Sequence, residues 1–514
     1  MRRNIEQNEG VFGMYISTRN NYDKVSAAHA IKLGMVPAGG LFVPEQIPVF
    51  SLSEILSLKG SSYQEIAEKI FSLFLEDYSL AEIRACVDKA YNDGNFTHPQ
   101  IAPLFKLNDR TFILELWHGP TAAFKDMALQ IMPHFLSLAV KKVKAGKEIV
   151  ILVATSGDTG KAALEGFKNV PGIKIVVFYP HQGVSRVQEL QMNTTDGGNT
   201  YVVAVRGNFD DCQNAVKNIF ADEEFKSLLA QHDYELSSAN SINWGRLLPQ
   251  IVYYFYAYLN LLTQDEIKAG EKINFVVPTG NFGNILAGWY AYRMGLPVNK
   301  FVCASNENKV LTDFFNTGIY DRNREFKQTN SPSMDILISS NLERFLFELT
   351  GHDGQRIKTW MEELNKTGRF QVDAETKKAM DEIMAAGFAT ERETLDTIRE
   401  VFAASGYTLD THTAVAVKVY GDYRKESGDM HKTVIDATAS PFKFNTSVLE
   451  AIKGQEATIG KDEFEILEEL GKISGMPLHP ALKDLDKKPV LHKRVCDKGE
   501  IKEVIEEILG ILDD

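Results

Sequence analysis

The amino-acid sequence predicts an α/β protein built on parallel β-sheets, with a helical unit before them and a helical appendage after them. Runs rich in β-branched residues end in turns that contain Gly or Ser, and an amphipathic helical stretch follows each run. This alternation is typical of parallel sheets covered by helices on both faces. Five such runs span residues 148–154, 173–179, 200–205, 273–277 and 300–304. Ligands bind beyond the carboxyl ends of such strands, so we look for chemistry in the turns that follow them.

The chain of 514 residues divides into three predicted units. Residues 1–97 form an N-terminal unit with helical stretches at 26–34, 62–75 and 80–91. Residues 98–445 form the α/β core, with a smaller subdomain within about residues 130–210. Residues 446–514 form a C-terminal helical appendage, because their charged stretches at 461–473 and 500–509 have helical periodicity.

Composition excludes several classes of protein. Hydrophobic residues make up 44% and charged residues 24%, so the chain can bury a large core and is not disordered as a whole. The 56 basic residues against 69 acidic ones give a net charge of −13, with no long basic run. Nucleic acid and anionic membrane are therefore poor candidate partners. A small anionic substrate is compatible, because a few basic groups in one cleft can dominate the local field.

Other features concern the cellular setting. The four cysteines form no CxxC pair and no cluster with His, so we expect reduced, buried thiols and no metal site: Cys86, Cys212, Cys303 and Cys496. The start, MRRNIEQNEG, lacks the apolar stretch of a signal peptide, which predicts a cytoplasmic location. The most apolar segment, 247–262, is interrupted by Pro249 and Gln250 and is shorter than the ~20 residues a bilayer needs. We predict a buried core helix there.

The turn 278–284, PTGNFGN, follows one of the predicted strands and opens a helix. Its two glycines, Gly280 and Gly283, let backbone N–H groups gather around an anion, and the helix N-terminus adds a favourable dipole. The spacing is GxxG and not the GxGxxG of dinucleotide-binding turns. Taken alone, the turn fits a phosphate site and an ordinary strand-to-helix connection about equally.

A second turn, 155–160 with the sequence TSGDTG, also links a strand to a helix. Its hydroxyls and backbone N–H groups suit a carboxylate or a phosphate. Gly160-Lys161 is similar to part of a P-loop, but only two residues separate Gly157 from Gly160 and Ala162 stands where Mg²⁺ binding needs Ser or Thr. A nucleoside triphosphate site is therefore disfavoured.

The segment 116–126, LWHGPTAAFKD, places Lys125 among small residues and beside Phe124. A lysine in an apolar pocket loses its charge readily and can form a Schiff base. By itself, a surface lysine at a helix start is the commoner interpretation. We expect Asp126 to be a first-turn carboxylate and His118 to be structural. A reactive lysine, a phosphate cup and an anion loop are together the parts that a pyridoxal phosphate enzyme needs.

The sequence also resembles the threonine synthase family, a fold-type II branch of the tryptophan synthase β family. The motifs, in chain order, are HGPTAAFKD, ATSGDTG, NSINWGR, PTGNFGN and DATASPFKF. Residues 14–48 are similar to the opening segment of that family, and SPSMDILISSNLERFLFEL at 331–349 is similar to its longer fungal and bacterial subgroup. The chain departs from the family pattern at Ser440, where His is usual, at Asn20, where Gly is usual, and at Thr411, where Pro is common.

The resemblance implies a fold-type II enzyme with a large and a small parallel-sheet domain, and it implies roles for residues around the cofactor. Lys125 carries pyridoxal 5′-phosphate as a Schiff base and then shuttles protons. The cofactor phosphate is held by the backbone of Gly280, Asn281, Phe282, Gly283 and Asn284. Thr438 takes the position next to the pyridine nitrogen. Asp158 takes the position next to the ring hydroxyl, where relatives often have Asn.

The implied reaction converts O-phospho-L-homoserine and water to L-threonine and phosphate, by γ-elimination followed by addition of water at the β carbon. Ser156 and Thr159 are candidates to bind the substrate carboxylate. Candidates for the substrate phosphate are Asn240, Ser241, Asn243 and Arg246, since Arg suits bidentate recognition of anions. A structural ion pair is the alternative role for Arg246.

Two other functions are compatible with the same motifs. A phospho-lyase or a hydroxy-amino-acid dehydratase on this fold would release a keto acid and ammonia. A catalytically dead relative would bind the cofactor without turnover, although Lys125 and both anion loops are intact. We favour a monomer, without excluding an oligomer.

Overall fold

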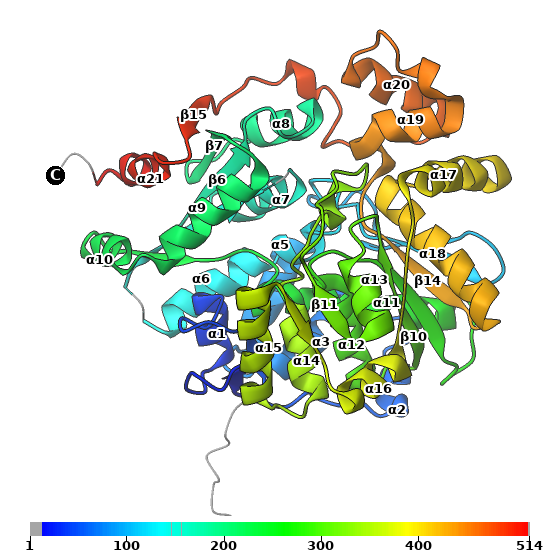
Figure 1. Ribbon diagram of the computed structural model, residues 1–514, viewed down its shortest axis with the longest axis horizontal. Helices are drawn as coiled ribbons and strands as arrows, with labels where there is room; N and C mark the ends of the chain where they lie inside the picture. Colours follow the sequence, from blue (N-terminus) through cyan, green and yellow to red (C-terminus); the bar gives the residue numbers. More distant parts are fainter. Residues whose placement is uncertain (1–12, 145, 156, 512–514) are drawn as a thin grey trace, which may run out of the picture.

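The computed structural model describes residues 13–144, 146–155 and 157–511, which form two lobes, each built on a parallel sheet (Figure 1). The larger lobe contains a six-stranded sheet in the order β13-β10-β9-β14-β4-β3, parallel except for the edge strand β3. Its strands are β3 (Leu104–Lys106), β4 (Thr111–Glu115), β9 (Ile273–Pro278), β10 (Val298–Ser305), β13 (Met384–Phe388) and β14 (Thr433–Ala437).

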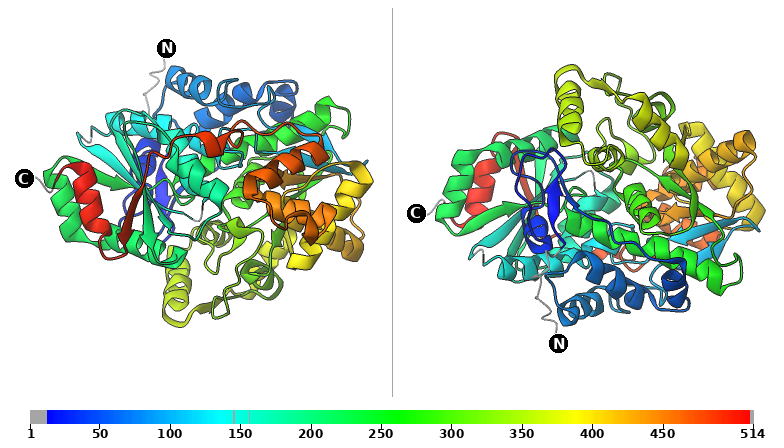
Figure 2. Two further views of the ribbon diagram at one scale, coloured as in Figure 1. Left: turned by 90° about the horizontal axis from the view of Figure 1, so that it is seen from above. Right: turned by 90° about the horizontal axis from the view of Figure 1, so that it is seen from below.

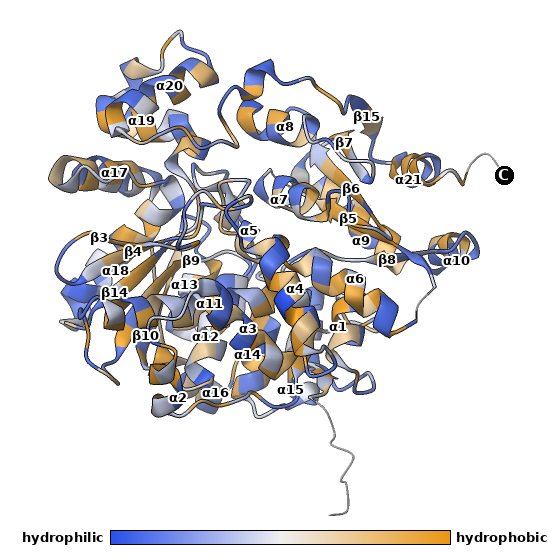
Figure 3. Ribbon diagram, turned by 180° about the vertical axis from the view of Figure 1, so that it is seen from behind, coloured by the Kyte–Doolittle hydropathy of each residue, from blue (hydrophilic) through white to orange (hydrophobic). Residues whose placement is uncertain are grey.

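The strands of the large sheet are apolar on both faces because both faces are covered. Phe275 and Val277 of β9 pack into the core shared with α11 (Trp244–Thr263) and α12 (Gly283–Arg293). Val276 points to the opposite face and packs beneath α18 (Thr411–Ser427). Continuous apolar runs, and not alternating ones, are what such strands require. The colouring by hydropathy shows the same property in the strands of both sheets (Figure 3).

The smaller lobe contains a fully parallel five-stranded sheet in the order β15-β7-β6-β5-β8. Its strands are β5 (Glu148–Ala154), β6 (Ile173–Pro180), β7 (Thr200–Arg206), β8 (Tyr234–Ser237) and β15 (Arg494–Asp497). The helices of this lobe are α7 (Asp158–Phe167), α8 (Arg186–Asn193), α9 (Phe209–Ala221), α10 (Glu223–Gln231) and α21 (Ile501–Leu509).

The small sheet extends beyond residues 130–210, where the sequence placed the smaller subdomain. Both β8 and β15 lie outside that range, and β15 belongs to the segment that the sequence interpreted as purely helical. These two edge strands are short and partly exposed, so they lack the apolar runs of the central strands. After α19 (Asn445–Lys453) and α20 (Glu463–Ser474) on the large lobe, the chain returns to complete the small sheet (Figure 2).

The N-terminal unit packs against the large lobe, where α3 contacts α11. It contains β1 (Tyr15–Ser17), α1 (Ala27–Leu33), β2 (Phe42–Pro44), α2 (Leu52–Ser57), α3 (Tyr63–Phe74) and α4 (Leu80–Ala90). Capping boxes start three of these helices, at Ser51, Ser62 and Ser79. Each serine satisfies a backbone N–H that the helix leaves unpaired, and the Glu three residues later bonds back to the serine.

The remaining elements connect the lobes or cover the large sheet. They are α5 (Asp126–Leu129), α6 (Met132–Lys142), α13 (Val310–Thr317), β11 (Ile319–Asp321), α14 (Leu342–Leu349), α15 (Gly354–Thr367), β12 (Arg369–Gln371), α16 (Ala374–Ile383) and α17 (Glu391–Ser405). The apolar segment 247–262 lies inside α11 and is almost wholly buried, as predicted. Among the described residues, no helix is long and apolar enough to span a membrane. All four cysteines are buried and unpaired, which confirms the prediction for the thiols.

Candidate active site

Lys125 lies immediately before α5, on a segment that leaves the carboxyl end of β4. The backbone N–H of Phe124 donates to the carbonyl of Thr438 at 2.8 Å, and Ala123 forms a β-bridge with Ala439. The segment is thereby tied to the chain that leaves β14, the neighbouring strand. Lys125 therefore sits beyond the carboxyl ends of two adjacent parallel strands, where the fold predicts chemistry.

The Lys125 side chain is half-buried, with Nζ 3.5 Å from the Ser333 hydroxyl. Burial lowers the pKa of Lys125 to about 8, and Asp158 opposes this shift while the charges of Arg246 and Lys443 add to it. Near neutral pH a useful fraction of this amine is uncharged. Only an uncharged amine can attack a carbonyl carbon, so the site favours the chemistry expected of Lys125.

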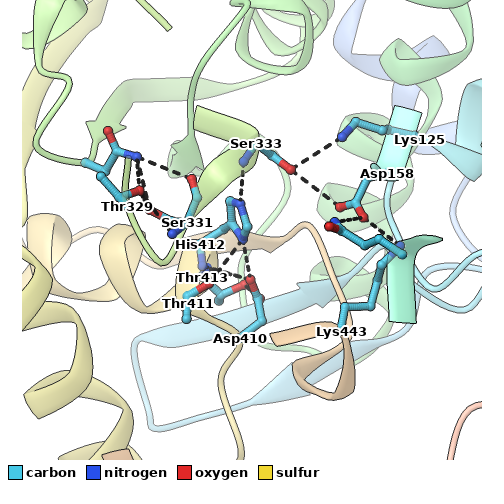
Figure 4. Close-up of polar contacts among 12 residues, drawn as sticks. Lys125, Asp158, Thr329, Ser331, Ser333, Asp410, Thr411, His412, Thr413 and Lys443 are labelled. Atoms are coloured by element: carbon cyan, nitrogen blue, oxygen red, sulfur yellow. Dashed lines mark hydrogen bonds and ion pairs between the residues drawn. The ribbon is translucent and has the colours of Figure 1, made fainter. Parts of the chain in front are cut away.

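Asp158, the first residue of α7, extends from the small lobe toward Lys125. Its Oδ1 lies 2.8 Å from Lys443 Nζ and accepts a hydrogen bond from Gln188 at 3.1 Å, while Oδ2 accepts from Ser333 at 3.4 Å (Figure 4). Burial alone would raise the pKa of Asp158, but Lys443 and Lys125 hold it well below its ordinary value. Asp158 is therefore an ionised carboxylate whose charge is matched by a buried ammonium.

The Ser333 hydroxyl contacts both Lys125 and Asp158, and His412 contacts the Ser333 backbone (Figure 4). The backbone N–H of Ser333 donates to His412 Nε2 at 3.1 Å. Because Nε2 accepts, the proton of the neutral ring is on Nδ1, which lies 3.1 Å from Asp410 Oδ1. His412 thus acts on the backbone and does not reach the Ser333 hydroxyl as a base.

The turn before α12 presents a row of free backbone donors. No acceptor among the described residues pairs with the N–H groups of Asn281, Phe282, Gly283, Asn284 and Ile285. Phe282 has a left-handed φ of 64°, which turns the chain into the helix. A side chain on Gly283 would meet Ser241 and Asn341 only at ordinary contact distances of 3.4 and 3.5 Å. The free donors therefore fit a phosphate group at a helix N-terminus.

The amide of Asn284 points away from that row of donors. Its Oδ1 accepts hydrogen bonds from the hydroxyls of Tyr253 at 2.5 Å and Tyr254 at 2.7 Å. The Tyr254 hydroxyl oxygen also lies 3.1 Å from Asp436 Oδ2 of β14, and burial raises the pKa of Asp436 to about 7. Asn284 can thus contribute its backbone N–H to an anion, while its side chain anchors the turn to the core.

In the loop before α7, the protein itself provides an acceptor for the backbone N–H groups. Thr155 Oγ1 accepts hydrogen bonds from the N–H groups of Gly157 and Gly160, at 3.0 and 2.9 Å. Two donors that the sequence offered to an anion are therefore occupied by the protein itself. Thr159 is half-buried in the first turn of α7, and Ser156 lies outside the described residues. Their role at the substrate carboxylate stays a prediction.

Among the candidates for the substrate phosphate, Arg246 differs from its neighbours. Its guanidinium is buried and donates to the carbonyl of Ala239 at 2.9 Å, and no carboxylate of the described residues forms an ion pair with it. Burial lowers the pKa of Arg246 to about 10. Its positive charge also contributes to the lowered pKa of Lys125. A buried, unmatched cation of this kind calls for an anionic ligand.

Asn243 is an exception in that group. Its Nδ2 donates to the carbonyls of Ile31 and Ser238, both at 2.9 Å, and its Oδ1 accepts from Gly245 N–H at 2.9 Å. The amide acts as the N-cap of α11, so we leave Asn243 out of the proposed substrate site. Asn240 is half-buried, and no hydrogen bond of its side chain to another described residue is found.

Ser241 couples the substrate loop to the phosphate turn. Asn341 Nδ2 donates to both Ser241 Oγ and the carbonyl of Asn281, each at 3.0 Å. Asn341 Oδ1 in turn accepts from the buried Arg344 at 2.7 Å, and Arg344 also donates to the carbonyl of Ile242. One asparagine and one arginine thus fix the relative position of two loops that are distant in sequence.

Three further residues singled out in the sequence lie close to Lys125 in the chain or in the fold: Thr438, Asp126 and His118. Thr438 is buried next to the backbone of Phe124, with no hydrogen bond of its hydroxyl to another described residue. Asp126 accepts from the backbone and hydroxyl of Thr121 at 2.8 and 2.7 Å, which closes the turn before Lys125. His118 is buried and pairs with Glu115 at 2.8 Å, in agreement with a structural role.

Comparison with known proteins agrees with this geometry. The family profile described as "Pyridoxal-phosphate dependent enzyme" matches residues 97–435, so the chain belongs to that class of enzymes. The profiles "Threonine synthase N terminus" and "Threonine synthase, C-terminal" match residues 14–91 and 413–505. The chain is 38% identical over 468 residues to threonine synthase of Pseudomonas aeruginosa, covering 90% of this chain and 95% of the relative. Within the class, it is a member of the threonine synthase family.

Two further relatives extend the comparison. Human "Threonine synthase-like 1" is 40% identical over 517 residues, and this chain spans 68% of its length while 96% of this chain is covered. The crystal structure of pyridoxal phosphate-bound threonine synthase from Brucella melitensis superposes with a TM-score of 0.84 at 36% identity, covering 97% of this chain and 98% of the other. The fold-type II architecture with pyridoxal phosphate as cofactor is thereby confirmed.

Two departures from the family pattern fit the local backbone. Asn20, where Gly is usual, has φ 51°, a left-handed conformation that Asn tolerates better than most residues. Thr411, where Pro is common, is the first residue of α18, a position that suits Pro but does not require it. Ser440 is fully buried and its hydroxyl has no partner among the described residues.

Sequence reasoning missed Ser333, Lys443, His412 and Asn341. Ser333 and Lys443 stand in the motifs SPSMDIL and DATASPFKF, but neither motif indicates contact with Lys125 or Asp158. The only local signal at Ser333 is a Ser-Pro-Ser turn, and Lys443 has the appearance of an ordinary surface lysine. Their roles depend on contacts between segments hundreds of residues apart.

Proposed function

We propose that this protein is a threonine synthase, which converts O-phospho-L-homoserine and water to L-threonine and phosphate. The observation that carries the proposal is the unmatched Arg246 guanidinium in the same site as Lys125. The row of free N–H groups at α12 already fits the cofactor phosphate, so Arg246 provides a second anion site. A substrate that brings its own phosphate needs such a second site.

Pyridoxal phosphate, when bound through Lys125 and the turn 280–284, supplies an electron sink for the carbanions formed on the substrate. Thr438 offers the ring a hydroxyl and not a carboxylate, which favours a weaker electron sink than a protonated ring. Lys125 Nζ takes the proton from the substrate Cα and, once it has passed that proton on, takes the proton from Cβ. Its lowered pKa allows it to accept and return a proton near neutral pH.

Substrate positioning follows from the placement of the other loops. Arg246 with Asn240 and Ser241 holds the substrate phosphate, which leaves from the γ carbon. Ser156 and Thr159 bind the substrate carboxylate, Thr159 from the first turn of α7. Asp158 lies next to the position of the cofactor ring hydroxyl, with Lys443 matching its charge.

We also infer a cytoplasmic location and a small-molecule substrate. The support for the cytoplasm is the set of four buried, unpaired thiols, which suits a reducing compartment. A monomer is our expectation for the assembly, and light scattering of the purified protein would test it. The boundaries at residues 97 and 445 likewise stay predictions.

The test combines product analysis with trapping of the cofactor. The purified protein, incubated with O-phospho-L-homoserine, should release threonine and phosphate in equal amounts. Formation of a keto acid and ammonia would instead establish a phospho-lyase or dehydratase. No product at all, with cofactor bound, would establish an inactive relative.

Borohydride reduction should attach the cofactor to Lys125. Lys125→Ala should abolish turnover while the phosphate turn still binds the cofactor weakly. The control Lys142→Ala removes a surface lysine paired with Glu82 and should leave turnover unchanged. Normal turnover of Lys125→Ala would show that another lysine carries the cofactor.

A further inference from the structure

The site contains a second buried lysine, Lys443, which the proposed reaction does not use. Lys443 follows β14 of the large lobe, and its ammonium is completely buried. It donates to the carbonyl of Thr121 at 3.0 Å and forms the 2.8 Å ion pair with Asp158 of the small lobe. A buried charge pair contributes little to stability by itself, so its presence here points to another use.

The charges around Lys125 show what that use is. Lys125 and Lys443 lie on either side of Asp158, and only Lys443 is in direct ion-pair contact with it (Figure 4). Ser333 Oγ separates Lys125 Nζ from the Asp158 carboxylate, at 3.5 and 3.4 Å. An unmatched carboxylate at this place would hold Lys125 in its charged form, which cannot attack a carbonyl.

We propose that Lys443 is a positioning residue that keeps the Lys125 amine reactive, because its ion pair cancels the field of Asp158 at Lys125. The pair gives the cofactor ring hydroxyl a fixed acceptor without adding a net negative charge to the site. Lys443 itself touches neither the reacting amine nor the substrate. The inference rests on the proposed role of Lys125, since a lysine without chemistry would not need a low pKa.

The other charged groups that face this cluster do not replace Lys443. Arg246 on α11 also favours the uncharged form of Lys125, and Asp126 favours the charged form. His479 faces Lys443, but burial and nearby positive charges lower the pKa of His479 to about 4, so it is neutral at pH 7. Gln188 contributes a neutral amide.

Removing Lys443 and removing Asp158 should shift the pKa of Lys125 in opposite directions. Lys443→Met leaves Asp158 without its ion-pair partner, while Gln188 and Ser333 still donate to it and Lys125 still favours its ionised form. The pKa of Lys125 then rises. Asp158→Asn leaves Lys443 unmatched, and its positive charge lowers the pKa of Lys125. The double variant Asp158→Asn/Lys443→Met has neither charge and returns the pKa toward that of the wild type.

The experiment measures the reactivity of Lys125 directly. The full chain, freed of cofactor with hydroxylamine, is labelled with trace acetic anhydride between pH 6 and pH 10, and mass spectrometry quantifies acetylation of the peptide that contains Lys125. At pH 7, Lys443→Met should label about tenfold more slowly than the wild type, the change expected when one nearby charge shifts a pKa by about 1. Asp158→Asn should label faster, and the double variant should lie within about twofold of the wild type.

Lys443→Arg, which keeps the charge, should retain the wild-type labelling curve. A wild-type curve for folded Lys443→Met, or a shift of both single variants in the same direction, would overturn the proposal. If Lys443→Met does not fold, Asp158→Asn and the double variant decide, since they must differ from each other at pH 7. The labelling needs neither cofactor nor substrate, so its result is independent of the product analysis that tests the proposed function.

Discussion

The two glycine-bearing turns of the site look alike in sequence but differ in what they leave free. Before α12, the N–H groups of residues 281–285 have no acceptor among the described residues. Before α7, Thr155 Oγ1 takes the N–H groups of Gly157 and Gly160, and what reaches the centre of the site is the Asp158 carboxylate. One turn therefore presents positive dipoles and the other a negative charge.

The comparison shows that glycine in a turn does not by itself leave backbone N–H groups free for an anion. The decisive feature is whether a side chain within the turn already accepts its N–H groups. Thr279, at the start of the α12 turn, donates its hydroxyl to the carbonyl of Val277 at 2.7 Å and leaves the N–H groups alone. Thr155 points its oxygen the other way, into its own turn.

The largest expected effect comes from replacing a glycine of each turn by a residue with a side chain. Gly283→Val should weaken cofactor binding at least about a hundredfold, because the side chain occupies the space beside the free N–H groups and charge-assisted hydrogen bonds are lost. The melting temperature of Gly283→Ala should stay near that of the wild type. Fluorescence titration with pyridoxal phosphate and thermal unfolding measure the two quantities.

Gly157→Ala is the matched variant of the other turn. Gly157 has φ 133°, and a Cβ there would lie 2.5 Å from the Gln188 side chain, so the loss should appear in thermal stability. Equal losses of cofactor affinity in Gly157→Ala and Gly283→Val, with stability unchanged, would mean that both turns bind the phosphate.

The next effect concerns the second anion site. Arg246→Ala should raise the apparent KM for O-phospho-L-homoserine about ten- to a hundredfold, since a charge-assisted pair contributes roughly 1.5 to 3 kcal/mol. Cofactor affinity should change much less, because the free N–H groups of α12 hold the cofactor. Steady-state kinetics test this, with an unphosphorylated amino acid as the control ligand. A lower melting temperature with an unchanged KM would assign Arg246 a purely structural role.

The pH dependence of stability should differ between Asp436, next to the α12 turn, and Asp158, in the α7 turn. Burial raises the pKa of Asp436 to about 7, so between about pH 4 and 7 the folded state holds a proton that the unfolded state has lost. The free energy of unfolding should therefore fall as the pH rises through this range, by up to about 4 kcal/mol. Asp436→Asn should remove that fall in urea unfolding curves at pH 5 and pH 8. Asp158, whose pKa is lowered, stabilises above about pH 4 and loses its contribution on acidification.

The smallest effect should come from the two threonines. Thr155→Val leaves the N–H groups of Gly157 and Gly160 without their acceptor and should cost about 2 kcal/mol of stability. Thr279→Val removes one donor and should cost about 1 kcal/mol or less. Urea unfolding measures both. A larger loss for Thr279→Val would contradict the distinction between the turns.

The sequence predicts the long, uninterrupted apolar strands better than the short or interrupted ones. The run 148–154 is recognisable because both faces of β5 are covered and every central position is apolar. The sequence did not predict β14, because Asp436 interrupts its apolar pattern. It did not predict β13, because that strand contains Ala and Gly in place of β-branched residues. Short strands of this kind owe their conformation to their neighbours and not to local preference.

In the site, residues within a local motif could be predicted, and residues brought in from afar could not. The α12 turn and Lys125 have local signals in the form of glycines and small neighbours. Ser333 reaches Lys125, and Lys443 reaches Asp158, from segments that follow more than 200 residues later in the chain. No pattern within either segment indicates the contact.

The return of the chain to the small lobe has a consequence for protein synthesis. β15 pairs in parallel with β7, and Ile501 and Ile505 of α21 cover the face beneath them. Until residues 494–509 leave the ribosome, the β7 edge has no strand to pair with, and Val203 and Val205 lack the α21 side chains that bury them in the folded protein. A nascent chain that has already formed β5, β6 and β7 therefore carries an open sheet edge until the segment 494–509 pairs with it.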